Sequence, residues 1–532
     1  NYADTFGEYS FFLRAPGKDG ALTDIPLNPA DPSEGNFSWG DTEWGELGFT
    51  PRLEGHGDDL SSVVGVKGSM DMGINYDFSA SYGSNYIHYY LRNSVNLSWG
   101  PYSPHNFVIG DLQQEETNLN ADFSYAMSDN INIAFGAEWR DEVYTMYRGQ
   151  KEAWMPGPWA DVALLVNPES SDSSTYTAPG LAANGMPGTS PDAAGVFDRQ
   201  NTAFYVDTEF SLSDLLLQAA FRAEEFSDGN STSDFKLAGR YSLGNLITLR
   251  GGYSTGFRAP TPGQMNYTGV VTSFDGPTGM QVQEGTLRPT DDLAVQMGGT
   301  ALVPEDATNM SFGFTSNPIS NLSLTFDMYT IDIVNKIIKS RSLAVEDPNF
   351  SKLAFYTNAL DTKTNGFDLV AVYKMGNTNI SLAMNHNEIE VVEHRQVEVV
   401  ETDTSYFVDP ISTGLIDNIE NNLPKDRITV SVTQNIGKSL SVMARLNQYG
   451  ETLDERGTLG DDKATVDAVS FIDVEANYRV SNNLTVVLGA NNVTNAYPNE
   501  IPTRASQGMP YPRRSPLGYH GGFTYLRLMY TF

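Results

Sequence analysis

The stretch that decides the fold is Gly521–Phe532, GGFTYLRLMYTF, at the carboxyl end of the sequence. Every second residue from Thr524 to Phe532 is apolar or amphipathic, and the interleaved positions place Arg527 among aromatic residues. A period of two predicts a β-strand with one face in an apolar medium and the other in a mixed or aqueous one. The strand ends on an aromatic residue, whereas soluble chains usually end in a polar segment that frays into water.

The composition favours many strands joined by tight turns. The sequence has 532 residues, with 48 Gly and an aromatic content of 11%. Its mean hydropathy is −0.32, and no apolar run reaches the roughly 18 residues of a membrane-spanning helix. A membrane β-barrel remains open, because its strands alternate and are only mildly hydrophobic overall.

The charge balance and the absence of cysteine exclude several functions. There is no Cys, which rules out disulfides, thiolate metal sites and cysteine nucleophiles. The net charge of −33 makes nucleic acid a poor partner, because phosphate binding requires clustered Lys and Arg.

Short and long connections between the predicted strands alternate along the chain. In a transmembrane antiparallel up-and-down β-barrel, short turns lie in the periplasm and long loops lie outside the cell. The pattern therefore predicts an all-β fold of this kind, with about 17 strands counted from Val63. The short connections include Ser128-Asp129, Ser213-Asp214 and Gly244-Asn245, and the long ones include 150–197, 258–309, 393–426 and 495–520.

Two regions are predicted from this pattern. Residues 1–62 are rich in turn-forming residues and are expected to be mostly a long extracellular loop region. Residues 63–532 are expected to form the barrel. A closed bacterial barrel has an even number of strands, so either the count of about 17 slips by one or the first strands lie outside this sequence.

Seven stretches resemble motifs of the TonB-dependent outer-membrane receptors, and they occur in the same order as in that family. The most characteristic is Phe257-Arg258-Ala259-Pro260, a turn that follows a barrel strand. The seven are Asn132–Tyr144 (NIAFGAEWRDEVY), Gly252–Gln264 (GYSTGFRAPTPGQ), Leu302–Phe314 (LVPEDATNMSFGF), Leu322–Ile337, Thr364–Asp368 (TNGFD), Asn491–Tyr497 (NNVTNAY) and Tyr530–Phe532.

The end of the chain also resembles the last strand of bacterial outer-membrane barrels. In those proteins a terminal Phe and alternating apolar residues form the assembly signal. Here the matching residues are Leu526, Leu528, Tyr530 and Phe532.

The resemblance implies an architecture larger than this sequence. The family's barrels have about 22 strands, with an amino-terminal plug domain inside the barrel and a segment that contacts the energy-coupling protein TonB. Residues 1–62 lack the plug's periodicity. The plug domain and roughly the first five strands are therefore expected upstream of Asn1.

The resemblance also implies the function of an active-transport receptor in the bacterial outer membrane. Such a receptor binds a scarce solute at its extracellular loops and imports it with energy from the TonB complex. A ferric siderophore or similar iron chelate is the foremost solute, followed by an oligosaccharide, a vitamin or a peptide. Outer-membrane lipid and lipopolysaccharide are further expected partners.

Four aromatic residues in predicted extracellular loops are candidate ligand-binding residues: Trp154, Trp159, Tyr267 and Tyr406. Exposed aromatic rings can stack on sugars, porphyrins or catecholate rings, and they can equally form the interfacial girdle of a barrel. Arg258 is interpreted as a structural residue that fixes its turn by hydrogen bonds.

The sequence contains no catalytic motif, and its six His show no metal-ligand spacing. We therefore expect no enzyme, no metal and no cofactor. Two alternatives to the receptor remain: a passive outer-membrane channel, and a structural or adhesive barrel that displays its loops. A plug domain upstream would exclude the passive channel. A soluble all-β enzyme, a third alternative, predicts a closed hydrophobic core.

Overall fold

The structure is a computed structural model of residues 1–532. It describes all of them except 12, 15–24, 38–46, 161–163, 166–175, 178–180, 275–280, 348–350, 401–403, 456–462, 503–509, 513 and 532.

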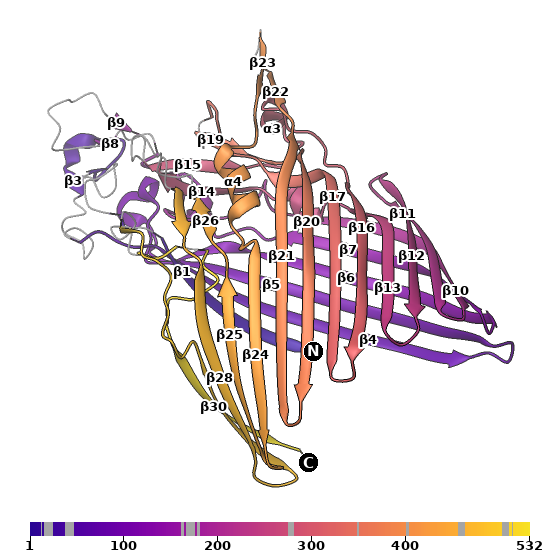
Figure 1. The fold of residues 1–532 in the computed structure, drawn as a ribbon. Coiled ribbons are helices and arrows are strands. Elements are labelled where there is room, and N and C mark those ends of the chain that lie inside the picture. The colour runs from indigo at the N-terminus through magenta and orange to yellow at the C-terminus, as the bar shows by residue number, and fades with distance from the viewer. Residues whose placement is uncertain are drawn as a thin grey trace.

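A single antiparallel sheet of 18 strands dominates the structure (Figure 1). Each strand of the sheet pairs with the sheet strand that follows it in the sequence. The first strand of this series of pairs is β1 and the last is β30. The predicted all-β, up-and-down barrel fold is thereby confirmed. The sheet strands are β1 (Tyr2–Ser10), β4 (Arg52–Ser69), β5 (Ile74–Arg92), β6 (Phe107–Ser128), β7 (Ile131–Met146), β10 (Gly195–Leu212), β11 (Leu215–Phe226), β12 (Ser231–Leu243), β13 (Ile247–Arg258), β16 (Glu305–Ile319), β17 (Leu322–Lys339), β20 (Tyr356–Met375), β21 (Thr378–His394), β24 (Asp426–Ile436), β25 (Leu440–Tyr449), β28 (Val469–Arg479), β29 (Leu484–Asn491) and β30 (Phe523–Tyr530).

The two ends of the sheet differ as the connection lengths predicted. Short turns such as 213–214 and 376–377 lie at one end, and long connections such as 147–194 and 259–304 lie at the other. One connection on the long side is itself short, the turn 227–230 between β11 and β12. The small elements α1 (Lys151–Trp154), α2 (Pro262–Asn266), α3 (Asp292–Gln296) and α4 (Thr413–Asn421) belong to the long connections. In Figure 1 the helix α4 and the small strands near it lie above the sheet, away from the short hairpins.

The predicted start of the barrel at Val63 is wrong. Strand β4 begins at Arg52, and β1 precedes it and pairs with it from Tyr2 opposite Leu60 to Ser10 opposite Arg52. The segment RLEGHGDDL has little apolar alternation, so its strand structure depends on the pairing with β1 on one side and β5 on the other. Strand β1 supplies the one strand by which the predicted count of about 17 falls short of 18.

The first hairpin lies where the sequence pattern gives no sign of a turn. The chain reverses at residues 70–73, where Gly73 has a φ of +82°. The alternation of Met70, Met72, Ile74 and Tyr76 continues across this turn, so it resembles one uninterrupted strand. Glycine adopts a positive φ without steric cost, which explains the reversal at Gly73.

The last strand has the two faces that its sequence predicted. Leu526 and Leu528 are each 67% exposed on the outward face. On the inward face the Tyr525 hydroxyl donates to Glu475 Oε2 at 2.6 Å, and the Arg527 guanidinium lies 5.5 Å from the centre of the Tyr525 ring. Phe532, the last residue of the expected assembly signal, lies outside the described residues.

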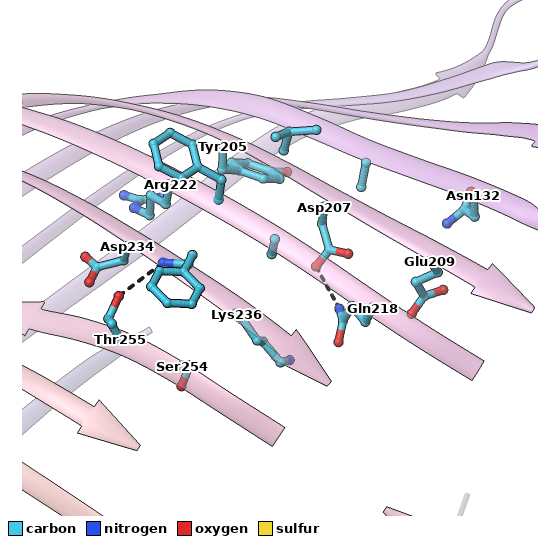
Figure 2. Close-up of a pocket in the computed structure, with 15 residues that line it drawn as sticks. Asn132, Tyr205, Asp207, Glu209, Gln218, Arg222, Asp234, Lys236, Ser254 and Thr255 are labelled. Atoms are coloured by element: carbon cyan, nitrogen blue, oxygen red, sulfur yellow. Dashed lines mark hydrogen bonds between the residues drawn. The ribbon is translucent and has the colours of Figure 1, made fainter. Parts of the chain in front are cut away.

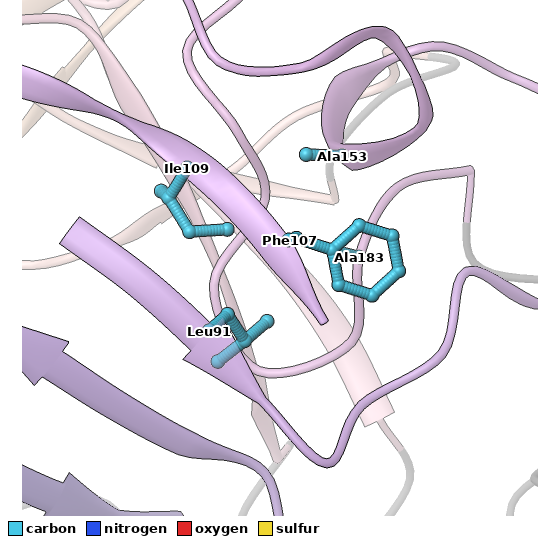
Figure 3. Close-up of a cluster of buried hydrophobic side chains, with 5 residues drawn as sticks. All are labelled: Leu91, Phe107, Ile109, Ala153 and Ala183. Atoms are coloured by element: carbon cyan, nitrogen blue, oxygen red, sulfur yellow. The ribbon is translucent and has the colours of Figure 1, made fainter. Parts of the chain in front are cut away.

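The buried apolar side chains gather at the long-connection end. One cluster contains Leu91, Phe107, Ile109, Ala153 and Ala183, where the ends of β5 and β6 meet α1 and the segment after it (Figure 3). The sheet itself presents large apolar residues such as Phe221 and Leu237 outward. A soluble sheet protein buries such a face, so this arrangement differs from the closed core expected of a soluble enzyme. In the described part of the chain, no helix has the length and apolar character needed to cross a membrane.

Candidate ligand-binding site

The motif residue Arg258 joins two of the stretches that the sequence singled out. Arg258 lies at the end of β13, opposite Glu305 at the start of β16. Its Nε donates to Glu305 Oε2 at 3.1 Å and its Nη2 donates to Oε1. The same Oε1 accepts a hydrogen bond from the Ile337 amide at 2.7 Å. These contacts join the end of β13 to the start of β16 and to Ile337 of β17.

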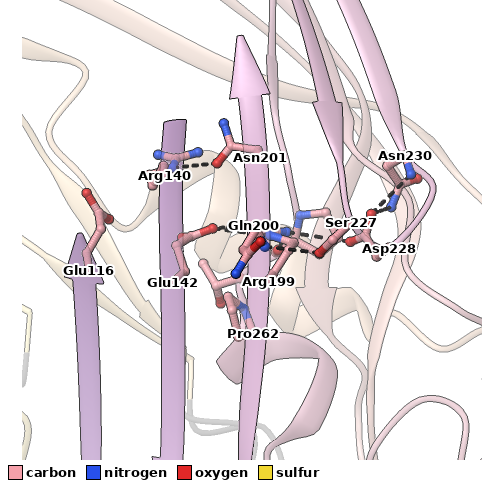
Figure 4. A network of polar contacts seen from close by, with 12 residues as sticks. Glu116, Arg140, Glu142, Arg199, Gln200, Asn201, Ser227, Asp228, Asn230 and Pro262 are labelled. Carbon is pink, nitrogen blue, oxygen red and sulfur yellow. Dashed lines mark hydrogen bonds and ion pairs between the residues drawn. The ribbon is translucent and has the colours of Figure 1, made fainter. Parts of the chain in front are cut away.

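The other end of the motif turn is held by a buried arginine that the sequence analysis missed. Arg199 on β10 is 3% exposed, and its Nη1 donates to the carbonyl oxygen of Pro260. Its Nε and Nη2 donate to Glu142 Oε2 on β7 at 3.2 and 2.5 Å (Figure 4). The motif turn is therefore fixed at both ends by ion-paired arginines. The alternating charges Glu138, Arg140 and Glu142 of β7 were the available signal, but the sequence does not show which residues of β10 lie opposite them.

A partly enclosed cavity of about 370 Å³ lies among the long connections. This is the lower part of the size range of small-molecule sites in proteins. Its walls come from the ends of β5, β6 and β7, from α1, from residues 181–193, and from residues 267–270 and 283–287. The cluster shown in Figure 3 contributes one lining residue, Ile109, and packs α1 against β6.

Close backbone contacts hold the segment 181–190 in place as one wall of this cavity. The amides of Ala183 and Gly188 both donate to the Ala153 carbonyl oxygen, at 3.0 and 2.8 Å, and the Thr189 amide donates to Ile109 O at 2.7 Å. A Cβ added at Gly188 would lie 2.6 Å from the Ala153 Cβ, so this approach requires glycine. The wall is thus part of the fold rather than a loose loop.

The hydroxyl groups around the cavity are largely free of protein partners. Among the described residues no hydrogen bond joins the hydroxyls of Tyr89 and Tyr267 to the protein, and the buried Thr268 Oγ1 also has none. Burial raises the pKa of the Tyr267 hydroxyl above its ordinary value, and the nearby Tyr356 and Tyr89 raise it further. These phenols therefore remain protonated at neutral pH and can donate hydrogen bonds to a ligand.

The structure brings two of the four predicted aromatic residues together. Trp154 at the end of α1 and Tyr267 after α2 both line the cavity. Trp159 is only 3% exposed, packs against Ile25 and Phe37, and donates from Nε1 to Pro26 O at 2.6 Å. The expected exposure of Trp159 is therefore wrong, because its ring fills the space between two connections.

Tyr406 lies elsewhere. It belongs to the hairpin of β22 (Val397–Val400) and β23 (Ser405–Val408), where its side chain is 47% exposed and does not line the cavity. Figure 1 shows this hairpin projecting above the rest of the structure.

A second, larger hollow of about 570 Å³ lies on the wall formed by β7 and β10–β13. Figure 2 shows its polar side chains, among them Asp207, which accepts a hydrogen bond from Gln218 Nε2 at 2.7 Å. The Tyr205 hydroxyl donates to Asp122 Oδ1 at 2.6 Å. These four groups satisfy one another across neighbouring strands, although Asp234 Oδ2 in the same lining has no partner among the described residues. The hollow lies on an open wall, and we therefore take the smaller and more enclosed cavity as the candidate site.

No group of three or more His, Asp or Glu in the described residues is arranged to hold a metal ion.

One family model matches nearly the whole chain. Residues 2–493 match the family model described as TonB dependent receptor-like, beta-barrel. The chain belongs to this family, and the resemblance found in the sequence is confirmed. No curated protein sequence matches the chain.

Several solved structures share the fold. They include the siderophore receptor PirA from Acinetobacter baumannii (TM-score 0.57, 12% identity, covering 92% of this chain and 63% of that one). The FrpB iron transporter from Neisseria meningitidis has a TM-score of 0.57 and 12% identity, covering 100% of this chain and 70% of that one. A mutant of the ferric enterobactin receptor PfeA from Pseudomonas aeruginosa has a TM-score of 0.58 and 13% identity, covering 94% of this chain and 66% of that one. The chain thus spans roughly two thirds of the length of these proteins, and at such identities the likeness shows the fold alone.

Proposed function

We propose that the chain is the barrel of an outer-membrane receptor that binds a scarce solute in the cavity lined by Trp154 and Tyr267 and imports it with TonB-coupled energy. The observation that carries this proposal is the cavity itself, built from the long connections of a barrel in this receptor family. Its role is to bind and transport a solute rather than to convert it.

An iron chelate is the foremost solute. The similar solved structures are described as a siderophore receptor, an iron transporter and a ferric enterobactin receptor, which supports this choice. An oligosaccharide, a vitamin or a peptide would also find aromatic rings and hydroxyls in the cavity. The TonB complex is the proposed energy-coupling partner, in keeping with the family to which the chain belongs.

We also propose that the outward face of the 18-stranded sheet lies in the outer membrane. The outward apolar residues of strands such as β11 and β30 would contact outer-membrane lipid. The long connections would lie outside the cell, where their carboxylates can meet divalent cations bridged to lipopolysaccharide. The short turns would face the periplasm.

Uptake by cells tests the proposal. In a strain that lacks the gene, restoring the full-length gene should restore saturable uptake of a labelled ferric chelate, and removal of TonB should abolish it. A passive channel would give uptake that rises linearly with concentration and persists without TonB. An adhesive barrel would give no uptake in either strain, and either result would contradict the proposal.

A further inference from the structure

The charge of the cavity indicates which ligands it can accept. Asp192 is the only charged residue among the described residues that line it; no Lys or Arg does so. The sequence as a whole carries a net charge of −33, so its long-range potential also disfavours anions.

Two basic residues close to the lining along the chain have contacts elsewhere, and a third, Arg148, two positions after the lining residue Met146, is exposed and does not line the cavity. Arg288 donates to the carbonyl oxygens of Asn266 and Ala193, at 3.1 and 3.3 Å, and its guanidinium lies 5.1 Å from the centre of the Phe197 ring. The Lys151 ammonium lies 5.5 Å from the centre of the Trp99 ring, outside the cavity. Neither side chain is among those that line the cavity.

The groups that remain for a ligand are neutral. Tyr89, Trp154 and Tyr267 supply aromatic surface from three separate parts of the chain. The hydroxyls of Tyr89, Tyr267 and Thr268 supply hydrogen-bonding groups that the described protein leaves unpaired. A buried polar group without a partner is costly, so Thr268 Oγ1 is available to bond an oxygen or nitrogen atom of a ligand.

A polyanion would enter this cavity at a large cost. Its charge would lose hydration, find no cationic partner in the lining and meet the carboxylate of Asp192. A neutral ligand would lose far less hydration, and a cationic one would gain the attraction of Asp192.

We propose that the cavity selects uncharged or cationic ligands that combine an apolar or aromatic body with oxygen atoms, and that it rejects polyanionic ones. This inference rests on the proposed function and specifies its substrate class. Among iron chelates it favours those of the hydroxamate type, whose ferric complexes are neutral or cationic. It disfavours those of the tricatecholate type, whose ferric complexes are trianionic.

Binding to the purified full-length protein tests this selection without requiring transport. Two probes are compared by quenching of tryptophan fluorescence: a neutral ferric trihydroxamate and a trianionic ferric tricatecholate. The neutral complex should bind at least about tenfold more tightly, which corresponds to roughly 1.4 kcal/mol. Equal or tighter binding of the tricatecholate would overturn the inference, and so would binding of neither chelate.

Three variants locate the effect in the cavity. Tyr267→Phe removes a hydroxyl but keeps the ring, and it should weaken binding of the neutral chelate about fivefold, the value of one ordinary hydrogen bond. Asp192→Asn should strengthen binding of the trianionic chelate and leave the neutral one nearly unchanged. Tyr478→Phe, the same change at an exposed position near the short-turn end of β28, should alter neither. Equal losses in Tyr267→Phe and Tyr478→Phe would contradict the assignment to this cavity.

The binding and uptake experiments separate the two proposals. Selective binding of the neutral chelate without TonB-dependent uptake would contradict the proposed function and support the charge selection. TonB-dependent uptake of the trianionic chelate in preference to the neutral one would support the proposed function and overturn the selection.

Discussion

Replacing Arg199 with methionine is expected to lower the free energy of unfolding by about 3–5 kcal/mol, the usual cost of removing one partner of a buried ion pair. Both members of this pair are buried, with 3% of the Arg199 side chain and 8% of the Glu142 side chain exposed. The variant leaves the Glu142 carboxylate buried without its two hydrogen bonds, and it also frees the Pro260 carbonyl oxygen. The motif turn should therefore loosen together with the upper ends of β7 and β10.

Denaturant unfolding of the reconstituted protein, followed by tryptophan fluorescence, measures this effect. Arg250→Met is the matched control, because the pair Arg250–Asp327 has similar geometry but is 44% and 30% exposed. An exposed pair contributes about 1 kcal/mol or less. The double variant Arg199→Met, Glu142→Gln should recover part of the loss, since it removes the buried charge. Equal losses in Arg199→Met and Arg250→Met would show that burial does not determine the cost.

Leu526→Arg is expected to lower the stability of the barrel in a bilayer by about 2–4 kcal/mol, as an arginine on the lipid face near the membrane centre does. Leu526 lies on the outward face of β30, opposite Leu488 of β29. The guanidinium would have to sit in hydrocarbon or draw water into it. Because β30 belongs to the expected assembly signal, the variant should also accumulate less in the outer membrane.

Met529→Arg in the same strand is the control. Met529 lies on the inward face with Tyr525 and Arg527, opposite Thr485. An arginine there meets polar surroundings, so folding yield and stability should change little. The comparison uses urea unfolding in lipid vesicles together with the amount of folded protein in outer-membrane fractions. A larger loss for Met529→Arg than for Leu526→Arg would reverse the assignment of the two faces.

Much of the fold could be predicted because it depends on local patterns. The period of two in β30 assigned Leu526 and Leu528 to one face and Arg527 to the other, and the structure shows that arrangement. The sorting of short and long connections followed from topology, since antiparallel neighbours alternate between the two ends of a sheet.

The errors arose where pairing between distant segments determines the structure. Strand β1 and the first half of β4 have weak alternation and are strands because of their neighbours. At the first hairpin, the turn at Gly73 preserves the alternation on both sides, so the period of two continues through it.

The candidate site could be predicted only in part. Selecting the aromatic residues of the predicted loops identified Trp154 and Tyr267, which line the cavity. The same selection included Trp159, because a sequence does not show which loop aromatic is buried. The role of Arg199 depends on residues far apart in the chain, Glu142 and Pro260. Such contacts become visible only when the register of β7 against β10 is known.

Lipid quenching along β11 tests the central claim, a barrel wall with one face in the membrane, most directly. The sequence has no Cys, so single cysteines at positions 217–222 can each carry a fluorescent label in vesicles that contain brominated lipid. The structure predicts quenching that alternates, strong at Leu217, Ala219 and Phe221 and weak at Gln218, Ala220 and Arg222. Uniform quenching, or strong quenching at the second set, would contradict the account.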